Sequence, residues 1–108
     1  MITYEFFLDK KGFPVLYVEE KYYMLWELGS CKMEYIDIII SKLEELKLGK
    51  ISNYSFGYER FCINCNSGDC MIRDEFKKKD LIAVATNEIR FLIKEWKEFY
   101  QKWEREKK

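Results

Sequence analysis

The chain has 108 residues, in which 19 lysines and arginines balance 19 aspartates and glutamates, histidine is absent, and 18% of the residues are aromatic. This length predicts one domain, residues 1–108, with a core that needs no disulfide or metal for its stability. The zero net charge argues against a general nucleic-acid binder, and no apolar run reaches the ~18 residues of a membrane span. The missing histidine removes the commonest general base and the commonest metal ligand.

The first half of the chain predicts two strands followed by two helices. Apolar residues alternate over residues 2–8, and the turn sequence DKKG leads into a second strand over residues 13–19. Residues 20–28 have apolar positions at helical spacing and predict a short helix. A longer helix is expected over residues 30–48, with Ser30 as its N-cap, because apolar residues recur there every three or four positions.

Residues 51–86 return to a period of two and predict a meander of strands, the last of them over residues 80–85. The sequence NSGD at residues 66–69 is typical of a tight turn. A turn centred on its middle two residues makes Cys65 lie opposite Cys70. The same register pairs Ile63 with Ile72 and Cys62 with Arg73.

A C-terminal helix is predicted from Thr86, which can act as its cap. Its apolar stripe consists of Ile89, Leu92, Ile93, Trp96, Phe99, Tyr100 and Trp103. The order of the elements predicts an α+β fold, a two-layer sandwich in which two long helices pack on one face of an antiparallel sheet.

The four cysteines are the first candidates for chemistry. Cys62, Cys65 and Cys70 follow the spacing C-x2-C-x4-C, and Cys31 lies far from them in the sequence. A zinc site would need all four thiolates, but on a strand Cys62 and Cys65 point to opposite faces. A Cys65–Cys70 disulfide fits the register, yet a reducing cytosol disfavours it. We therefore expect free, buried or half-buried thiols and no bound metal.

The sequence does not predict an enzyme. Without histidine, nucleophilic catalysis of the Cys–His or Ser–His kind cannot operate, and no glycine-rich loop that would hold a phosphate is present. Adjacent acids such as Glu44 and Glu45 are typical of a solvated surface, because neighbouring side chains diverge. No cofactor is expected.

A nucleic-acid-binding or regulatory module is the alternative. Its platform would be the aromatic residues of the predicted sheet, which lie near basic residues in the sequence and could stack on bases. Interleaved acids would repel a phosphate backbone, and these rings are expected to face the helices instead. The rings are Tyr54, Phe56, Tyr58 and Phe61, and the basic residues are Arg60, Arg73 and Lys77 to Lys79.

Several stretches of the chain resemble one family when they are read together. They are TYEFFLDKKGFPVLYVEE, YYMLWELGS, ELKLGKISNYSFGYERFCI and the closing NEIRFLIKEWKEFYQKW. In the order of their predicted elements, in chain size and in local sequence they are similar to small immunity proteins of bacterial contact-dependent growth inhibition and related polymorphic toxin systems. The resemblance implies a cytoplasmic, non-enzymatic protein that binds the C-terminal toxin domain of a cognate effector, often a nuclease, and blocks its active site or an exosite.

Local charge agrees with a basic protein partner. Residues 1–59 contain ten acids and seven bases, so their net charge is −3 although the whole chain is neutral. Acidic groups can mimic phosphate and steer a basic nuclease, whereas a membrane partner is not expected. The candidate partner-binding residues are Glu19, Glu20, Glu27, Glu34, Asp37, Glu44 and Glu45.

Overall fold

The computed structural model describes residues 2–107 and confirms the α+β class. The elements in chain order are β1 (Tyr4–Leu8), β2 (Pro14–Val18), the 3₁₀ helix η1 (Glu20–Ser30), α1 (Met33–Lys47), β3 (Tyr54–Gly57), β4 (Phe61–Cys65), β5 (Asp69–Asp74), β6 (Lys79–Ala85) and α2 (Thr86–Glu106). None of the helices within residues 2–107 has the length and apolarity of a membrane-spanning segment.

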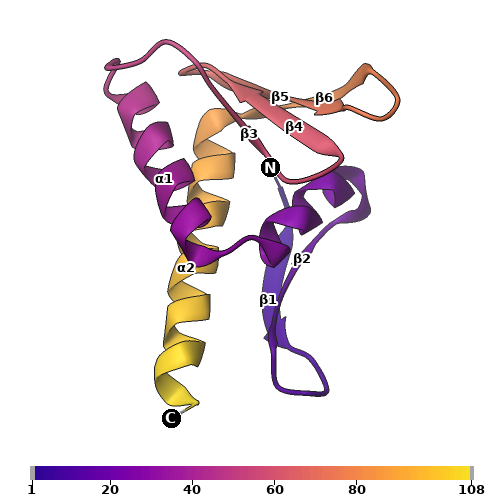
Figure 1. Ribbon diagram of the computed structural model, residues 1–108, viewed down its shortest axis with the longest axis vertical. Coiled ribbons are helices and arrows are strands. Elements are labelled where there is room, and N and C mark those ends of the chain that lie inside the picture. The colour runs from indigo at the N-terminus through magenta and orange to yellow at the C-terminus, as the bar shows by residue number, and fades with distance from the viewer. Residues whose placement is uncertain (1, 108) are drawn as a thin grey trace.

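The described strands form two antiparallel sheets rather than one. β1 and β2 make a hairpin, and β3 to β6 make a four-stranded meander in chain order. Between β2 and β3 the chain builds η1 and α1, which separate the two sheets along the sequence. The long helix α2 contacts β1 and β2 as well as β5 and β6, and α1 packs on α2 and β3 (Figure 1). The helix layer therefore joins two sheets into one body.

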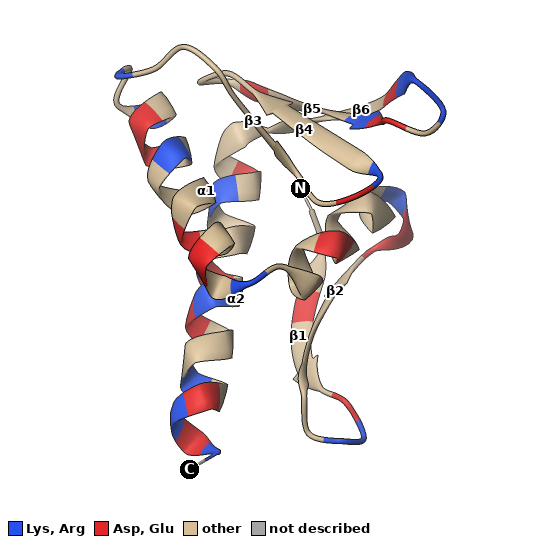
Figure 2. Cartoon of the chain, viewed as in Figure 1, with Lys and Arg blue, Asp and Glu red and all other residues tan. Residues whose placement is uncertain are grey.

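The apolar stripe of α2 provides much of the shared core, as its spacing predicts. Trp96 is almost fully buried, and its ring lies 5.6 Å from that of Phe6 on β1. Near the end of α2 the indole N–H of Trp103 donates a 2.8 Å hydrogen bond to the carbonyl oxygen of Gly12 in the hairpin turn. Gly12 adopts a φ of 84°, which the turn sequence anticipated. Charged residues concentrate in the C-terminal part of α2 (Figure 2).

Both predicted helix caps are wrong. Ser30 ends η1, and α1 begins three residues later, after the extended Lys32. Thr86 is the first residue of α2, and its hydroxyl donates a 2.8 Å hydrogen bond to the carbonyl oxygen of Asn66. The side chain of Thr86 thus fastens the helix to the β4–β5 turn instead of capping it.

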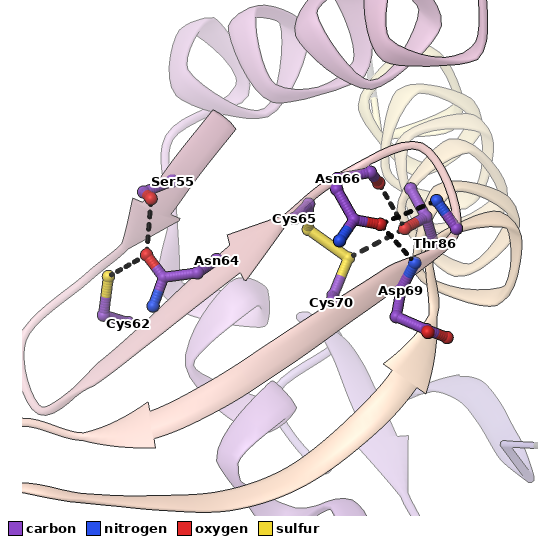
Figure 3. Close-up of a disulfide and its surroundings, with 9 residues drawn as sticks. Ser55, Cys62, Asn64, Cys65, Asn66, Asp69, Cys70 and Thr86 are labelled. Atoms are coloured by element: carbon purple, nitrogen blue, oxygen red, sulfur yellow. Dashed lines mark hydrogen bonds between the residues drawn. A yellow bond between two sulfur atoms is a disulfide. The ribbon is translucent and has the colours of Figure 1, made fainter. Parts of the chain in front are cut away.

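The β4–β5 hairpin has the predicted register but corrects the prediction of four free thiols. Cys65 and Cys70 lie opposite each other with a Cα–Cα distance of 4.0 Å and form a disulfide (Figure 3). The backbone N–H of the neighbouring Asn66 donates to the Asp69 carbonyl oxygen and closes the turn. The cysteines therefore occupy the next, non-hydrogen-bonded pair, where side chains approach most closely. Both are buried, whereas Cys31 and Cys62 are free.

Thiol counting tests the disulfide. In unfolded, unreduced protein, alkylation is expected to modify two cysteines, Cys31 and Cys62, and after reduction all four. Replacing Cys65 and Cys70 together by alanine should lower the free energy of unfolding by about 2 kcal/mol, because the closed loop is short. Mass spectrometry and urea unfolding measure both effects, and four modified thiols without reductant would contradict the bond.

At the opposite end of β5, Asp74 is a buried carboxylate with a full set of partners. It accepts hydrogen bonds from the Arg60 guanidinium at 2.8 Å and from the backbone N–H groups of Phe76 and Lys77. The hydrogen bond from Arg60 outweighs the effect of burial and, with these backbone bonds, lowers the pKa of Asp74 to about 2. The charged carboxylate therefore stabilises the folded state.

This pKa predicts a loss of stability in acid. An aspartate has an ordinary pKa of about 3.9, so the contribution of Asp74 is complete above about pH 4 and is lost as the pH falls through about 2. Between these limits the free energy of unfolding of wild-type protein should fall more steeply with pH than that of Asp74→Asn. Asp80→Asn, at an exposed salt bridge to Arg73, is the control and should follow the wild-type slope. Equal slopes for wild type and Asp74→Asn would contradict the assignment.

Candidate functional site

Three of the seven acids predicted to bind a partner are engaged by lysine or arginine. They lie on α1. Asp37 pairs with Lys97 of α2 at 2.5 Å, and Glu45 pairs with Lys42 at 3.3 Å within α1. Glu44 accepts hydrogen bonds from Lys94 and from the buried Arg90, and these bonds lower its pKa. Asp37 and Glu44 therefore hold α1 to α2, and all three carry charges that are already compensated within the chain.

Two further candidates, Glu34 and Glu27, are explained by their local surroundings. Glu34 is exposed in the first turn of α1, where a negative charge is favoured by the helix dipole. Glu27 lies half-buried in η1. Burial, and secondarily the charge of Glu27, raise the pKa of the Cys31 thiol to about 11. Neither residue joins a cluster with the other candidates.

The remaining two candidates, Glu19 and Glu20, lie together beside the β1–β2 hairpin. A hollow of about 340 Å³ is lined by Thr3, Tyr4, Glu5, Tyr17, Glu19 and Glu20. The carboxylate of Glu19 accepts a 2.9 Å hydrogen bond from the backbone N–H of Thr3, which fixes its position. The register opposes Glu5 to Tyr17, so the structure brings a third acid to this place.

Three aromatic side chains extend this surface. Phe7, Tyr17 and Trp26 are 42%, 43% and 44% exposed, respectively. Strand alternation turns Phe7 and Tyr17 away from α2, because their neighbours on each strand fill the core. Trp26 of η1 lies 5.8 Å from the Tyr17 ring, and its indole N–H donates a 2.9 Å hydrogen bond to the Val18 carbonyl oxygen. We call Glu5, Phe7, Tyr17, Glu19, Glu20 and Trp26 together the hairpin face.

The hairpin face combines features that favour binding to a basic protein surface. The Trp26 ring is held by its hydrogen bond to β2 and lies against the Tyr17 ring, so little side-chain entropy is lost when a partner covers these two rings. Acidic positions lie on β1 and where β2 leads into η1 (Figure 2), and the three acids line the same hollow as Tyr17. Lys21 is a neighbouring base, and its ammonium group lies 5.5 Å from the ring centre of Tyr22.

The aromatic residues of the four-stranded sheet do not form the stacking platform of the alternative hypothesis. Phe56 and Phe61 are buried in the core, and the half-buried Tyr54 stacks on Phe56 at 5.7 Å. Two nearby bases are engaged by acids, Arg60 by Asp74 and Arg73 by Glu75 and Asp80. The expectation that these rings are turned inward is confirmed for Phe56 and Phe61, which therefore cannot stack on bases, and is wrong for Tyr58, which is 54% exposed.

Two of the six residues of the hairpin face were predicted from the sequence. The two acids Glu19 and Glu20 were predicted, but Glu5, Phe7, Tyr17 and Trp26 were not. The missed signal is the hairpin register itself, because a turn at DKKG puts the odd-numbered residues of both strands on one face. Comparisons with protein-family models, with curated proteins and with solved structures find no match for this chain.

Proposed function

We propose that this chain is a non-enzymatic immunity protein that binds and neutralises the C-terminal toxin domain of a cognate contact-dependent inhibition effector. The partner is proposed to be a nuclease, whose basic active-site surface or exosite would be covered. The observation that carries the proposal is the hairpin face, in which three acids and Tyr17 line one hollow, Trp26 lies against Tyr17, and Phe7 is exposed on the same face of β1 as Glu5. The resemblance of the sequence to small immunity proteins supports the same conclusion.

The composition of this surface fits the energetics of a tight protein complex. Tyrosine and tryptophan are enriched among residues that dominate binding energy, and such residues are most effective where a partner excludes water from them. Acids beside them would attract a basic nuclease and raise the association rate. Because three of the four candidate acids on α1, Asp37, Glu44 and Glu45, are compensated by lysines and arginine, Glu5, Glu19 and Glu20 are proposed to supply most of the attraction at the hairpin face.

The test uses the C-terminal domain of the cognate effector, which the proposal expects to be encoded immediately upstream of this gene. Cells that produce this domain are expected to survive when they also produce the present chain, and the two purified proteins are expected to form a stable complex. Calorimetry measures the affinity, and a nuclease assay measures the inhibition. Absence of both protection and binding would contradict the proposal. Salt-dependent binding of the isolated chain to RNA or single-stranded DNA would favour the nucleic-acid alternative.

A further inference from the structure

The outer edge of β1 carries backbone groups that no described residue binds. Asp9 donates to the Phe13 carbonyl and Glu19 donates to the Thr3 carbonyl, which fixes the odd-numbered residues of β1 as those bonded to β2. In an antiparallel pair the alternate residues direct their N–H and C=O groups away from the partner strand. These are Tyr4, Phe6 and Leu8. Within residues 2–107 their outward groups have no hydrogen-bond partner in the structure.

The other edge of the same hairpin is closed. Pro14 has no N–H group, the Val18 carbonyl accepts the Trp26 indole N–H, and Gly29 of η1 packs against Leu16. β1 has none of these protections. Its sequence YEFFL contains no proline, lysine or arginine, and among residues 2–107 no strand or helix forms backbone hydrogen bonds with its outer edge.

The edge strands of the four-stranded sheet are protected too. On β3, the Tyr35 hydroxyl bonds both the N–H and the C=O of Gly57, at 3.0 and 2.7 Å. β6 has an irregularity in its register with β5 at Ile72 and Arg73 and begins with the charged pair Lys79 and Asp80. Bulges and charges of this kind discourage strand addition. β1 has one charged residue, Glu5, but among the described edge strands it is the one with no proline, no bulge and no side chain hydrogen-bonded to its outward backbone groups.

A groove runs beside the β1 edge, with α2 as its far wall. It has a volume of about 220 Å³ and is lined by Ile2, Tyr4, Glu88, Phe91 and Glu95. Phe91 is 55% exposed, and the Tyr4 hydroxyl donates a hydrogen bond to the Glu95 carboxylate. Glu88 accepts a 2.8 Å hydrogen bond from the Ile2 N–H. The groove therefore offers an apolar ring and negative charge next to open strand groups.

We infer that the β1 edge receives an extended basic and apolar segment of the partner protein as a third strand of the hairpin sheet. This inference rests on the proposed function and assigns its binding mode. Side chains of the added strand that point towards α2 would meet Phe91 and Glu95, and those on the other face would meet Glu5 and Phe7. Each face thus presents an aromatic ring and a carboxylate, which are complementary to an apolar and a basic side chain.

Hydrogen exchange tests the inference in the complex with the upstream effector's C-terminal domain. In the free protein, the amides of Tyr4, Phe6 and Leu8 should exchange fast, whereas those of Glu5 and Phe7 are protected by β2. In the complex, the first three should become protected. Leu8→Pro removes one outward N–H and should weaken binding about tenfold, while Leu8→Ala keeps that N–H and should bind within about threefold of wild type.

A second arm needs no natural partner. A short peptide of alternating lysine and valine should bind wild-type protein and protect the same three amides. The peptide methylated on the backbone nitrogens of alternate residues, in the phase that would face β1, should bind about tenfold more weakly. Equal binding of both peptides would overturn strand addition.

The outcomes separate this inference from the proposed function. A complex with the effector domain that leaves Tyr4, Phe6 and Leu8 unprotected overturns strand addition and leaves the proposed function standing. If the effector domain does not bind, the proposed function fails, and the peptide arm alone decides the inference. Protection of the three amides by a second copy of this chain, with a matching dimer in solution, would overturn the assignment to a partner segment.

Discussion

Replacing Phe7 and Tyr17 together by alanine is expected to weaken binding of the upstream effector's C-terminal domain by about 100-fold. Both rings lie on the outer side of the β1–β2 hairpin and are more than two-fifths exposed, so a partner would bury them whereas folding does not. Their removal should therefore reduce affinity much more than stability. Calorimetry with both proteins measures the dissociation constant, and urea unfolding of the free variant measures the stability.

Leu48→Ala provides the matched control for this loss. Leu48 is also a large exposed apolar residue, but it lies at the C-terminal end of α1, remote from the hairpin (Figure 1). Its replacement should leave the dissociation constant within about twofold of wild type, because exposed residues outside an interface do not contribute to it. Equal affinities for wild type and the Phe7/Tyr17 double variant would show that the partner binds elsewhere.

Gly57→Ala is expected to lower the free energy of unfolding by about 3 kcal/mol. A Cβ atom at this position would lie 2.2 Å from the carbonyl oxygen of Phe61 and 3.2 Å from the Cα of Cys62, both of them backbone atoms of β4. Neither atom can move aside without breaking the β3–β4 pairing. The Tyr35 hydroxyl, which bonds both backbone groups of Gly57, would also lose its geometry.

Gly68→Ala separates this effect from the general cost of replacing a strand or turn glycine. At Gly68 the nearest described atom to a new Cβ is the Asn66 side-chain oxygen at 3.6 Å, an ordinary contact. Its stability should change by less than about 1 kcal/mol. Urea unfolding of the three proteins at neutral pH makes the comparison, and similar stabilities of Gly57→Ala and Gly68→Ala would contradict the close approach of β3 and β4.

The local elements were predictable because short-range patterns determine them. Period-two alternation and the turn sequences DKKG and NSGD predicted both hairpins, and for the second hairpin they predicted the register to the residue, including Cys65 opposite Cys70. The disulfide itself was predicted against, because the expected compartment was given more weight than the geometry. The division into two sheets was missed, since strand pairing across η1 and α1 depends on how α2 packs against both hairpins rather than on any local pattern.

The candidate site shows the same division between local and tertiary information. The sequence around an acidic residue does not indicate whether a lysine or arginine from a distant element will bind it. Glu44 and Asp37 therefore looked as available to a partner protein as Glu19 and Glu20. Only the packing of α1 on α2 reveals that Arg90, Lys94 and Lys97 engage them. Phe7, Tyr17 and Trp26 were not among the predicted partner-binding residues, because aromatic residues are usually buried and an exposed ring has no marker in the sequence.

The central claim is that the acids of the hairpin face attract a basic protein partner. The most direct measurement is the salt dependence of the affinity for the upstream effector's C-terminal domain, for wild type and for the triple variant Glu5→Gln, Glu19→Gln, Glu20→Gln. Glutamine keeps the size of each side chain and the oxygen that accepts the Thr3 N–H. Wild-type affinity should fall as salt rises, and the triple variant should bind about tenfold more weakly at low salt with a much flatter dependence. Identical affinities and identical salt dependence for the two proteins would contradict the account.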